Sequence, residues 1–229
     1  LDNLDLSEFP ELEQYMLHKI FVLNDTFKKY FKNYDFHNLY KELLNFCTVD
    51  LSAFYFDIRK DCLYCDDKET KKRKSTIKVL NIILNSLLKW FAPILSFTTE
   101  EIYKLLVKDQ KSIHLEKFLE IPSKFKNEKI NKKWIELIKI RDICNISIEE
   151  KRSSKELGSS LEADLKIQLN KNLKEFTENI DFSEICITSK AKVDYKDDIE
   201  TTAITSKAKG TKCSVCWKIS EESCPRHPI

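Results

Sequence analysis

Apolar side chains recur at every third or fourth residue over long stretches of residues 12–148, and this period constrains the fold more than any other feature. Amphipathic helices gather such side chains on one face. The first three stripes consist of Leu12, Met16, Ile20, Leu23, Phe27 and Tyr30; of Leu44, Cys47, Leu51, Phe54 and Ile58; and of Ile77, Leu80, Leu84, Leu87 and Phe91. The sequence therefore predicts helices that share one core.

Turn residues between the stripes indicate where the helices begin and end. Asp35 is a candidate N-cap for the second helix, and Asp66-Asp67 follows its last turn. Pro93 ends or kinks the third helix, because proline cannot continue the backbone hydrogen bonding. Residues 114–128 lose the period and contain a proline, so we interpret them as a connecting loop.

A fourth and a fifth helix are also expected. In the stretch FTTEEIYKLL, Thr98 and Glu101 have the spacing of a capping box. A long helix follows with Ile130, Trp134, Leu137, Cys144 and Ile148 on one side, and Arg141 falls on the same stripe, so its guanidinium must reach water or a partner. We expect Gly158 to end this helix in a left-handed conformation.

The period changes to two at Leu161. Residues 161–169 alternate strictly between apolar and polar side chains, which predicts a half-buried strand. A short helix over 173–180, a second strand over EICITS (184–189) and a third strand over about 199–208 follow. The predicted fold is mainly α: an antiparallel helical bundle (1–158), a small α+β subdomain (159–208) and a C-terminal zinc knuckle (209–229).

Two pairs of metal-ligand residues lie close together near the end of the chain. Cys213-x-x-Cys216 and Cys224-x-x-His227 each have the spacing at which two ligands share an edge of a tetrahedron. A Cys3His set suits one structural Zn²⁺, because four protein ligands leave no position open for water. About twenty residues cannot bury enough apolar surface to fold alone, and metal binding supplies the missing free energy.

Other interpretations of the cysteines stay open. The ligand pattern is also compatible with a coincidence in a frayed tail, or with a thiol redox switch at Cys213 and Cys216. Cys62-Leu-Tyr-Cys65 has the same spacing, but no second pair lies near it in the sequence. The chain has eight cysteines and no secretory leader, so we expect a reducing cytoplasm.

Trp217 directly follows the first cysteine pair. Its ring either packs back on the small subdomain or serves as a platform for an unstacked nucleobase. Lys212, Lys218 and Arg226 surround it in the sequence with charges that attract phosphate.

Charge alone does not indicate a partner. The formal net charge is only +2, and lysine is abundant throughout. Residues 124–155 nevertheless carry ten Lys and Arg against five Asp and Glu, and Arg141 and Arg152 in this stretch are candidates for RNA contact. No apolar run is long enough for a membrane span. The chain starts at Leu1 and has a single methionine, so we expect it to be cut from a longer protein.

The sequence contains no motif for catalysis. Phosphate-binding loops need several glycines, and the chain has two. No serine nucleophile motif is present, and His18, His37 and His114 are isolated. We therefore expect no catalytic and no ATP site in this chain.

Several motifs, in order and over nearly the whole chain, carry a resemblance to a known family. PELEQYMLHKI, YDFHNLYKELLNFCTVDLSAFYFDIRKDCLYCD, WFAPILSFTTEEIY, EEKRSSKELGSSLEADLKI and KCSVCW resemble the C-terminal anticodon-binding region, with its zinc knuckle, of bacterial isoleucyl-tRNA synthetase, a class I aminoacyl-tRNA synthetase. Cys213, Cys216 and Trp217 match two zinc ligands of that family and the tryptophan after them. The chain departs from the family in its short loop between the ligand pairs and in ending with His227 where a second CxxC is expected.

The resemblance implies a function. The parent protein is expected to be an ATP-dependent isoleucine–tRNA ligase of the cytoplasm, active in protein biosynthesis as a monomer. Its catalytic core, with ATP and Mg²⁺, and its editing domain are expected upstream. This chain is expected to bind the anticodon stem-loop of tRNA(Ile). The alternative is a zinc-stabilised helical scaffold that binds protein and no RNA, which the near-neutral charge favours.

Overall fold

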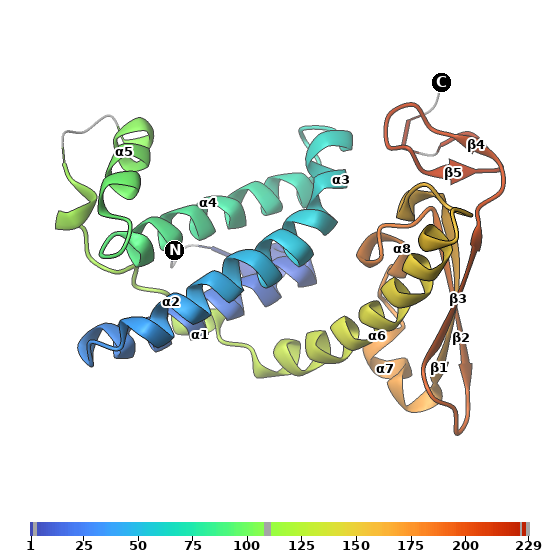
Figure 1. The fold of residues 1–229 in the computed structure, drawn as a ribbon, viewed down its shortest axis with the longest axis horizontal. Helices are drawn as coiled ribbons and strands as arrows, with labels where there is room; N and C mark the ends of the chain where they lie inside the picture. Colours follow the sequence, from blue (N-terminus) through green and yellow to red (C-terminus); the bar gives the residue numbers. More distant parts are fainter. Residues whose placement is uncertain (2–3, 108–110, 225, 228–229) are drawn as a thin grey trace. The chain divides into compact units, whose positions relative to one another are not determined.

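A computed structural model of the chain describes residues 1, 4–107, 111–224 and 226–227. The chain is mainly helical, with a three-stranded sheet and a two-stranded hairpin in its C-terminal part (Figure 1). It forms two compact units. The first comprises Leu1–Leu63 and Asp67–Asn131, and the second comprises Tyr64–Asp66 and Lys132–Ile229.

Helices make up the described part of the first unit. In chain order they are η1 (Leu6–Glu8), α1 (Glu11–Lys32), α2 (Phe36–Asn45), η2 (Phe46–Phe56), α3 (Asp57–Cys65), α4 (Lys71–Phe91), α5 (Ser96–Leu106), η3 (Ile113–Leu115) and η4 (Ser123–Phe125). The element η2 is π-helical and joins α2 to α3 in one continuous run, whereas η1, η3 and η4 are single 3-10 turns. The first predicted stripe lies on α1, the second on α2 to α3 and the third on α4, which confirms these three helices. The stripe predicted for α4 is not its core face, however: Ile77 is 42% exposed, and α4 buries the face that carries Val79, Ile82, Ile83, Ser86 and Trp90.

The predicted N-cap and the predicted stop are also confirmed. The Asp35 carboxylate accepts a hydrogen bond from the Asn38 backbone N–H at 3.2 Å, and α4 ends two residues before Pro93. The predicted capping box is wrong, because α5 begins at Ser96 and Thr98 therefore lies inside the helix.

The core of the first unit lies where α1 packs against α2 and α4. Phe27 and Trp90 contact each other edge to face, with ring centroids 4.9 Å apart. The Trp90 indole N–H donates to the Asn24 side-chain oxygen at 3.1 Å, so the buried ring keeps a hydrogen-bond partner. The fully buried side chains include Met16, Leu17, Ile20, Leu39, Leu43 and Tyr55.

The second unit combines one long helix with the sheet and the hairpin. Its elements are α6 (Glu128–Ser153, which starts in the first unit), η5 (Ser160–Glu162), β1 (Ala163–Asn170), η6 (Lys171–Leu173), α7 (Lys174–Thr177), α8 (Phe182–Ile185), β2 (Lys190–Lys196), β3 (Thr202–Lys207), β4 (Thr211–Lys212) and β5 (Ile219–Ser220). The strand order is β2-β1-β3, with β2 parallel and β3 antiparallel to β1.

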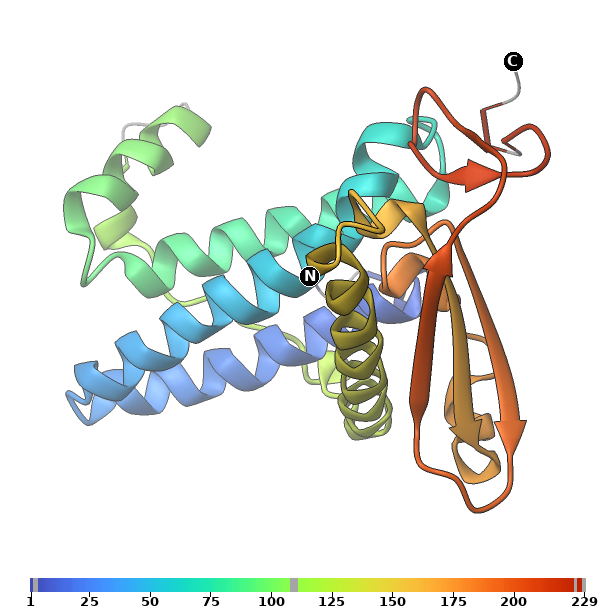
Figure 2. The same ribbon diagram turned by 45° about the vertical axis from the view of Figure 1, so that its right-hand side comes forward.

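The alternation predicted for the first strand is confirmed in β1. Ala163, Leu165, Ile167 and Leu169 are fully buried, while the residues between them point to the other face. Helix α6 lies along the buried face (Figure 2), where the Ser147 and Thr205 hydroxyls are 2.8 Å apart. The strand predicted at about 199–208 is confirmed as β3.

Two local predictions in this unit are wrong. EICITS does not form a strand: Phe182–Ile185 is the helix α8, because the Asp181 carboxylate accepts the N–H groups of Ser183 and Glu184 and starts a helical turn. The second strand begins at Lys190. Gly158 does not adopt the left-handed conformation; α6 ends at Ser153, and Lys155 takes that conformation with φ of 61°.

The three predicted domains stay a prediction. The compact units divide elsewhere, because most of α6 packs with the sheet instead of with the preceding helices. Among the described residues, none of the helices combines the length and the hydrophobicity that crossing a bilayer needs.

Candidate metal centre

The β4–β5 hairpin positions the first ligand pair. Lys212 pairs with Ile219, the Cys213 N–H donates to the Lys218 carbonyl at 2.9 Å, and the Trp217 N–H donates to the Cys213 carbonyl at 3.1 Å. These bonds close a tight turn over residues 213–217. The turn brings the Cys213 and Cys216 thiols to the same side.

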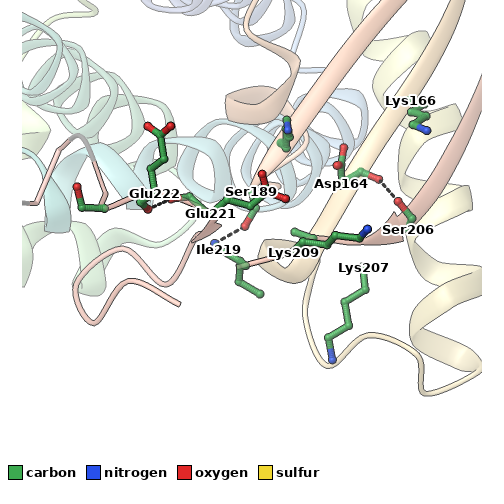
Figure 3. Close-up of a pocket in the computed structure, with 13 residues that line it drawn as sticks. Asp164, Lys166, Ser189, Ser206, Lys207, Lys209, Ile219, Glu221 and Glu222 are labelled. Atoms are coloured by element: carbon green, nitrogen blue, oxygen red, sulfur yellow. Dashed lines mark hydrogen bonds between the residues drawn. The ribbon is translucent and has the colours of Figure 1, made fainter. Parts of the chain in front are cut away.

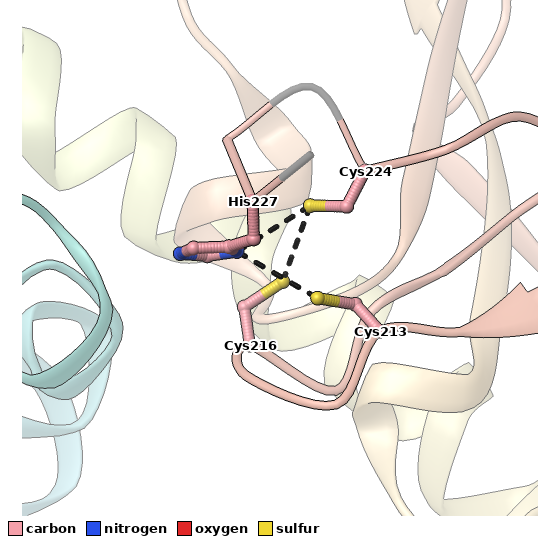
Figure 4. Close-up of side chains that lie close together, drawn as sticks. All are labelled: Cys213, Cys216, Cys224 and His227. Carbon is pink, nitrogen blue, oxygen red and sulfur yellow. Dashed lines mark hydrogen bonds between the residues drawn. The ribbon is translucent and has the colours of Figure 1, made fainter. Parts of the chain in front are cut away.

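Four side chains meet at the end of this hairpin. The ligand atoms of Cys213, Cys216, Cys224 and His227 all lie within 4.8 Å of one another (Figure 4). Within the described part of the chain, no other His, Cys, Asp and Glu residues form such a group. The structure therefore brings together all four residues that the sequence proposed as metal ligands.

The spacing of these atoms fits a tetrahedral zinc ion. Zinc–sulfur and zinc–nitrogen bond lengths imply tetrahedron edges of about 3.8 Å between two sulfurs and about 3.6 Å between sulfur and nitrogen. The Cys216 and Cys224 sulfurs are 3.8 Å apart. The Nδ1 atom of His227 lies 3.6 Å from the Cys213 sulfur and 3.5 Å from the Cys224 sulfur. The donor set and its dimensions thus suit Zn²⁺.

Local hydrogen bonds favour a negative charge at the centre. The backbone N–H groups of Cys216 and Val215 lower the pKa of the Cys213 thiol to about 6. Burial opposes ionisation of Cys224, but hydrogen bonds, among them those from the backbone N–H groups of Arg226 and His227, outweigh it and lower the pKa of that thiol. Burial raises the pKa of Cys216 to about 11. A cation that replaces the thiol protons stabilises the cluster, because thiolates are the ligand form.

Residues 64–66, which belong to the same unit, support the histidine ligand. The Nε2 atom of His227 lies 2.8 Å from the Cys65 carbonyl oxygen. A carbonyl can only accept, so Nε2 carries the proton and the Nδ1 lone pair faces the sulfurs. The Arg226 guanidinium binds the Asp66 carboxylate at 2.5 Å. Cys65 therefore contributes a backbone carbonyl next to the centre instead of a thiolate.

No sequence signal indicated this supporting contact. Cys65 drew attention only through its CxxC spacing with Cys62, and the Cys62 thiol is buried 3.7 Å from the Thr76 hydroxyl. A backbone carbonyl has no residue-type signature, so only the folded chain identifies it.

Trp217 is displayed at the surface beside the metal centre. Its side chain is 57% exposed, and its backbone has a φ of 63°, a conformation that costs a non-glycine residue free energy. The Lys212 ammonium lies 5.3 Å from the centre of the ring. Lys218, next in the chain, is half-buried. The exposed ring has not packed into a core.

The three arginines proposed for RNA contact differ in their surroundings. Arg226 is exposed and paired with Asp66. Arg152, on α6, is exposed and paired with Glu149 at 2.7 Å. Arg141 is buried, and its Nε donates to the Ile185 carbonyl at 2.9 Å. The polar partner expected for an arginine on the apolar stripe is therefore a backbone carbonyl of the same unit.

Two hollows border the hairpin. One, of about 340 Å³, contains the four ligand residues together with Lys212 and Lys218. The other, of about 660 Å³, lies between the open face of the three-stranded sheet and β5 (Figure 3). Both share Ser189, Ile219 and Ser220 in their walls.

Comparison with known proteins identifies relatives of the chain. The family model of the anticodon-binding domain of tRNA ligase matches residues 13–186. A protein of Pelagibacter ubique (strain HTCC1062) named isoleucine–tRNA ligase is 66% identical over 227 residues, which cover 99% of this chain and 25% of that protein. Proteins of the same name from Bartonella henselae and Agrobacterium fabrum are each 35% identical over 240 residues, again 99% of this chain and 25% of theirs. The chain thus spans about a quarter of the length of these relatives.

Proposed function

The chain belongs to the family of anticodon-binding domains of tRNA ligases, and from this premise we propose that it recognises the anticodon of tRNA(Ile) as part of an isoleucine–tRNA ligase. The observation that carries the proposal is the family match over residues 13–186. The name shared by the relatives supports the choice of isoleucine. No feature of the described residues favours a protein-binding scaffold instead.

In this proposal, catalysis and tRNA recognition belong to different parts of the parent protein. Activation of isoleucine with ATP and Mg²⁺ and its transfer to tRNA belong to a catalytic core outside this chain. The chain supplies binding energy and discrimination between tRNAs, and it makes no bond. A cytoplasmic location, a monomeric state and an antiparallel helical bundle of the class I type in the first unit are parts of the same proposal.

In the second unit, Cys213, Cys216, Cys224 and His227 hold one structural Zn²⁺ in this proposal. The ion orders a turn that has too little apolar surface to order itself. The support for this role is the match between the separations of the sulfur and nitrogen atoms and the edges of a zinc tetrahedron.

Trp217 acts as the platform for an anticodon base. Single-stranded loops are commonly recognised through bases that leave their stack and lie on aromatic rings. The exposure of the ring and its left-handed backbone support this role, because such strain persists where the surrounding structure holds a residue in place. Lys212 and Lys218 lie beside it for the phosphates, and Arg152 and Arg226 are further candidates for phosphate contact.

We expect Trp217→Ala to weaken binding of the tRNA(Ile) anticodon stem-loop by about 5- to 150-fold, since stacking contributes about 1–3 kcal/mol per base. Cys213→Ser should weaken binding as well, because it removes a ligand of the ion that orders the turn. Trp217→Phe keeps an aromatic face and serves as the matched control. The measurement is a stem-loop titration at several salt concentrations. Unchanged affinity and salt slope for both Trp217→Ala and Cys213→Ser would show that the recognition role is wrong.

A further inference from the structure

The open face of the three-stranded sheet carries lysines that oppose one another. In the register of β1 and β2, Asp164 lies opposite Lys190 and Lys166 lies opposite Lys192. These four side chains share the face turned away from the buried core. Like charges directly opposite each other destabilise a sheet. Lys166 and Lys192 therefore repel each other. Lys192 has a carboxylate partner in Asp194, 3.7 Å away on its own strand, whereas no ion pair of Lys166 is found within the described residues.

The hollow of about 660 Å³ extends this face toward the metal-binding hairpin (Figure 3). Its lysines are Lys166 on β1, Lys190 at the start of β2, Lys207 at the end of β3, and Lys209 just beyond it. All four are exposed. The hydroxyls of Ser189 and Ser206 also line it, as do Asp164, Glu221 and Glu222. In Figure 3, Lys166, Lys207 and Lys209 lie toward the sheet, and Glu222 lies on the side of β5.

Three of these ammonium groups have no carboxylate partner. Within the described residues, Lys166, Lys190 and Lys209 make no ion pair, whereas Lys207 lies 3.8 Å from Glu162. Several other exposed lysines of the unit are paired, as Lys171 is with Asp197 and Lys139 with Glu136. Three ammonium groups without a carboxylate at ion-pair distance thus line one hollow.

The chemistry of the hollow suits a phosphodiester backbone and not a base. Lysine binds phosphate as a flexible point charge, without the forked geometry that reads a base edge. No aromatic side chain lines this hollow, so a base would find no stacking surface. The hollow shares Ile219 and Ser220 with the neighbouring hollow that contains Lys212 and Lys218, which flank Trp217. A strand with one base on the ring can therefore place its neighbouring phosphates along these walls.

We propose that Lys166, Lys190 and Lys209 form a phosphate-binding track for the RNA nucleotides that flank the base on Trp217. This inference rests on the proposed function. The carboxylates of Glu221 and Glu222 repel phosphate at the hairpin side and so direct the backbone toward the sheet. The track contributes affinity without sequence discrimination, because phosphates are the same in every sequence.

The test is a titration of the unmodified 229-residue chain and its variants with the tRNA(Ile) anticodon stem-loop and with a stem-loop of altered anticodon. The triple variant Lys166→Gln/Lys190→Gln/Lys209→Gln should bind both RNAs about tenfold or more weakly at 0.1 M salt. Its salt slope should fall by about 2, since each lost phosphate contact on a single strand removes about 0.7. The ratio of the two affinities should stay unchanged.

The matched control is Lys139→Gln/Lys171→Gln/Lys174→Gln, which removes the same charge from exposed lysines of the same unit that are paired with carboxylates. It should keep most of the affinity and slope. If the two triple variants weaken binding equally, the effect is one of net charge and the track is wrong.

Two further outcomes distinguish failure of the phosphate track from failure of the proposed anticodon recognition. If Trp217→Ala weakens binding while the track variant does not, the recognition role stands and the track is overturned. If the unmodified chain binds neither stem-loop in a salt-dependent way, both fall. Polyglutamate serves as a probe for an acidic protein segment. If the track variant keeps its RNA binding but loses binding to polyglutamate, the lysines bind such a segment and the track is also overturned.

Discussion

Gly210 is the residue at which the chain enters the β4–β5 hairpin, and its backbone is in a conformation that only glycine adopts easily. Its φ is 117°, and a Cβ atom at this position would lie 2.0 Å from the Ser220 carbonyl oxygen. No rotation of a side chain relieves this contact, because the obstacle is the backbone of the partner strand. The pairing of β4 with β5, and with it the position of Cys213, depends on this single missing side chain.

We expect Gly210→Ala to weaken zinc binding by about fivefold or more, since backbone strain of this kind costs of the order of 1–3 kcal/mol. The measurement is competition for zinc with a chromophoric chelator. Gly158→Ala is the matched control, because its Cβ would meet only the flexible Glu162 side chain, at 3.2 Å, and its backbone is not left-handed. Equal zinc affinity in the two variants would contradict the role assigned to Gly210.

At the scale of elements, a buried ion pair and two further hydrogen bonds join four helical elements of the first unit. Glu13 on α1 is fully buried, and Arg59 on α3 binds it with two hydrogen bonds of 2.7 and 2.6 Å. The hydroxyls of Tyr55 on η2 and Thr76 on α4 also donate to Glu13, at 3.1 and 3.0 Å. A buried carboxylate held by four donors fixes the register of these helices, because sliding any helix would leave a charge without a partner.

Removing one member of this pair should lower the free energy of unfolding strongly, whereas removing both members should lower it little. Arg59→Met leaves a buried carboxylate without its cation, so we expect the free energy of unfolding to fall by about 3–5 kcal/mol. The double variant Glu13→Leu/Arg59→Met should recover most of that loss. Urea denaturation followed by circular dichroism measures both. Lys60→Met, which removes an exposed lysine paired with Asp57, is the control and should change stability little.

At the scale of the whole molecule, the two compact units depend on different sources of stability. The first has a core of aromatic and aliphatic side chains and contains none of the four metal ligands. In the second, the apolar face of β1 is covered. Of the described residues from 209 onward, which include the two short strands of the hairpin, only Cys216 is a buried apolar side chain. In the proposed function, a metal ion at the four ligand residues is therefore required only locally, for the hairpin.

Removal of zinc should unfold the hairpin and leave the rest folded. After chelation, we expect faster hydrogen exchange in residues 209–227 and at 64–66, because the Cys65 carbonyl loses the His227 N–H and Asp66 loses its arginine. Exchange in α1 and α4 should not change. Hydrogen exchange with mass spectrometry measures both regions. Faster exchange throughout the first unit would show that the ion supports more than the hairpin.

Local patterns predicted most elements because each depends on neighbours within a few residues. The stripe on α1 and the alternation in β1 reflect burial of one face, and the two ligand pairs reflect the reach of side chains on one turn. The wrong predictions have the same origin: the EICITS segment has the composition of a strand, but the Asp181 cap and the burial of Phe182 and Ile185 favour a helical turn. Whether such a segment forms a strand or a helical turn is therefore decided by its packing in the folded chain.

The amino-acid order by itself determined the helical character of the first part, the position of β1, and the four residues able to hold a metal, because period and spacing are local properties. Tertiary structure alone decided that Glu13 is paired with Arg59, that Cys65 orients His227 through a carbonyl, and that unpaired lysines of separate strands meet at one hollow. These contacts join residues far apart in the chain. Their free energy depends on distance and burial, which no local pattern contains.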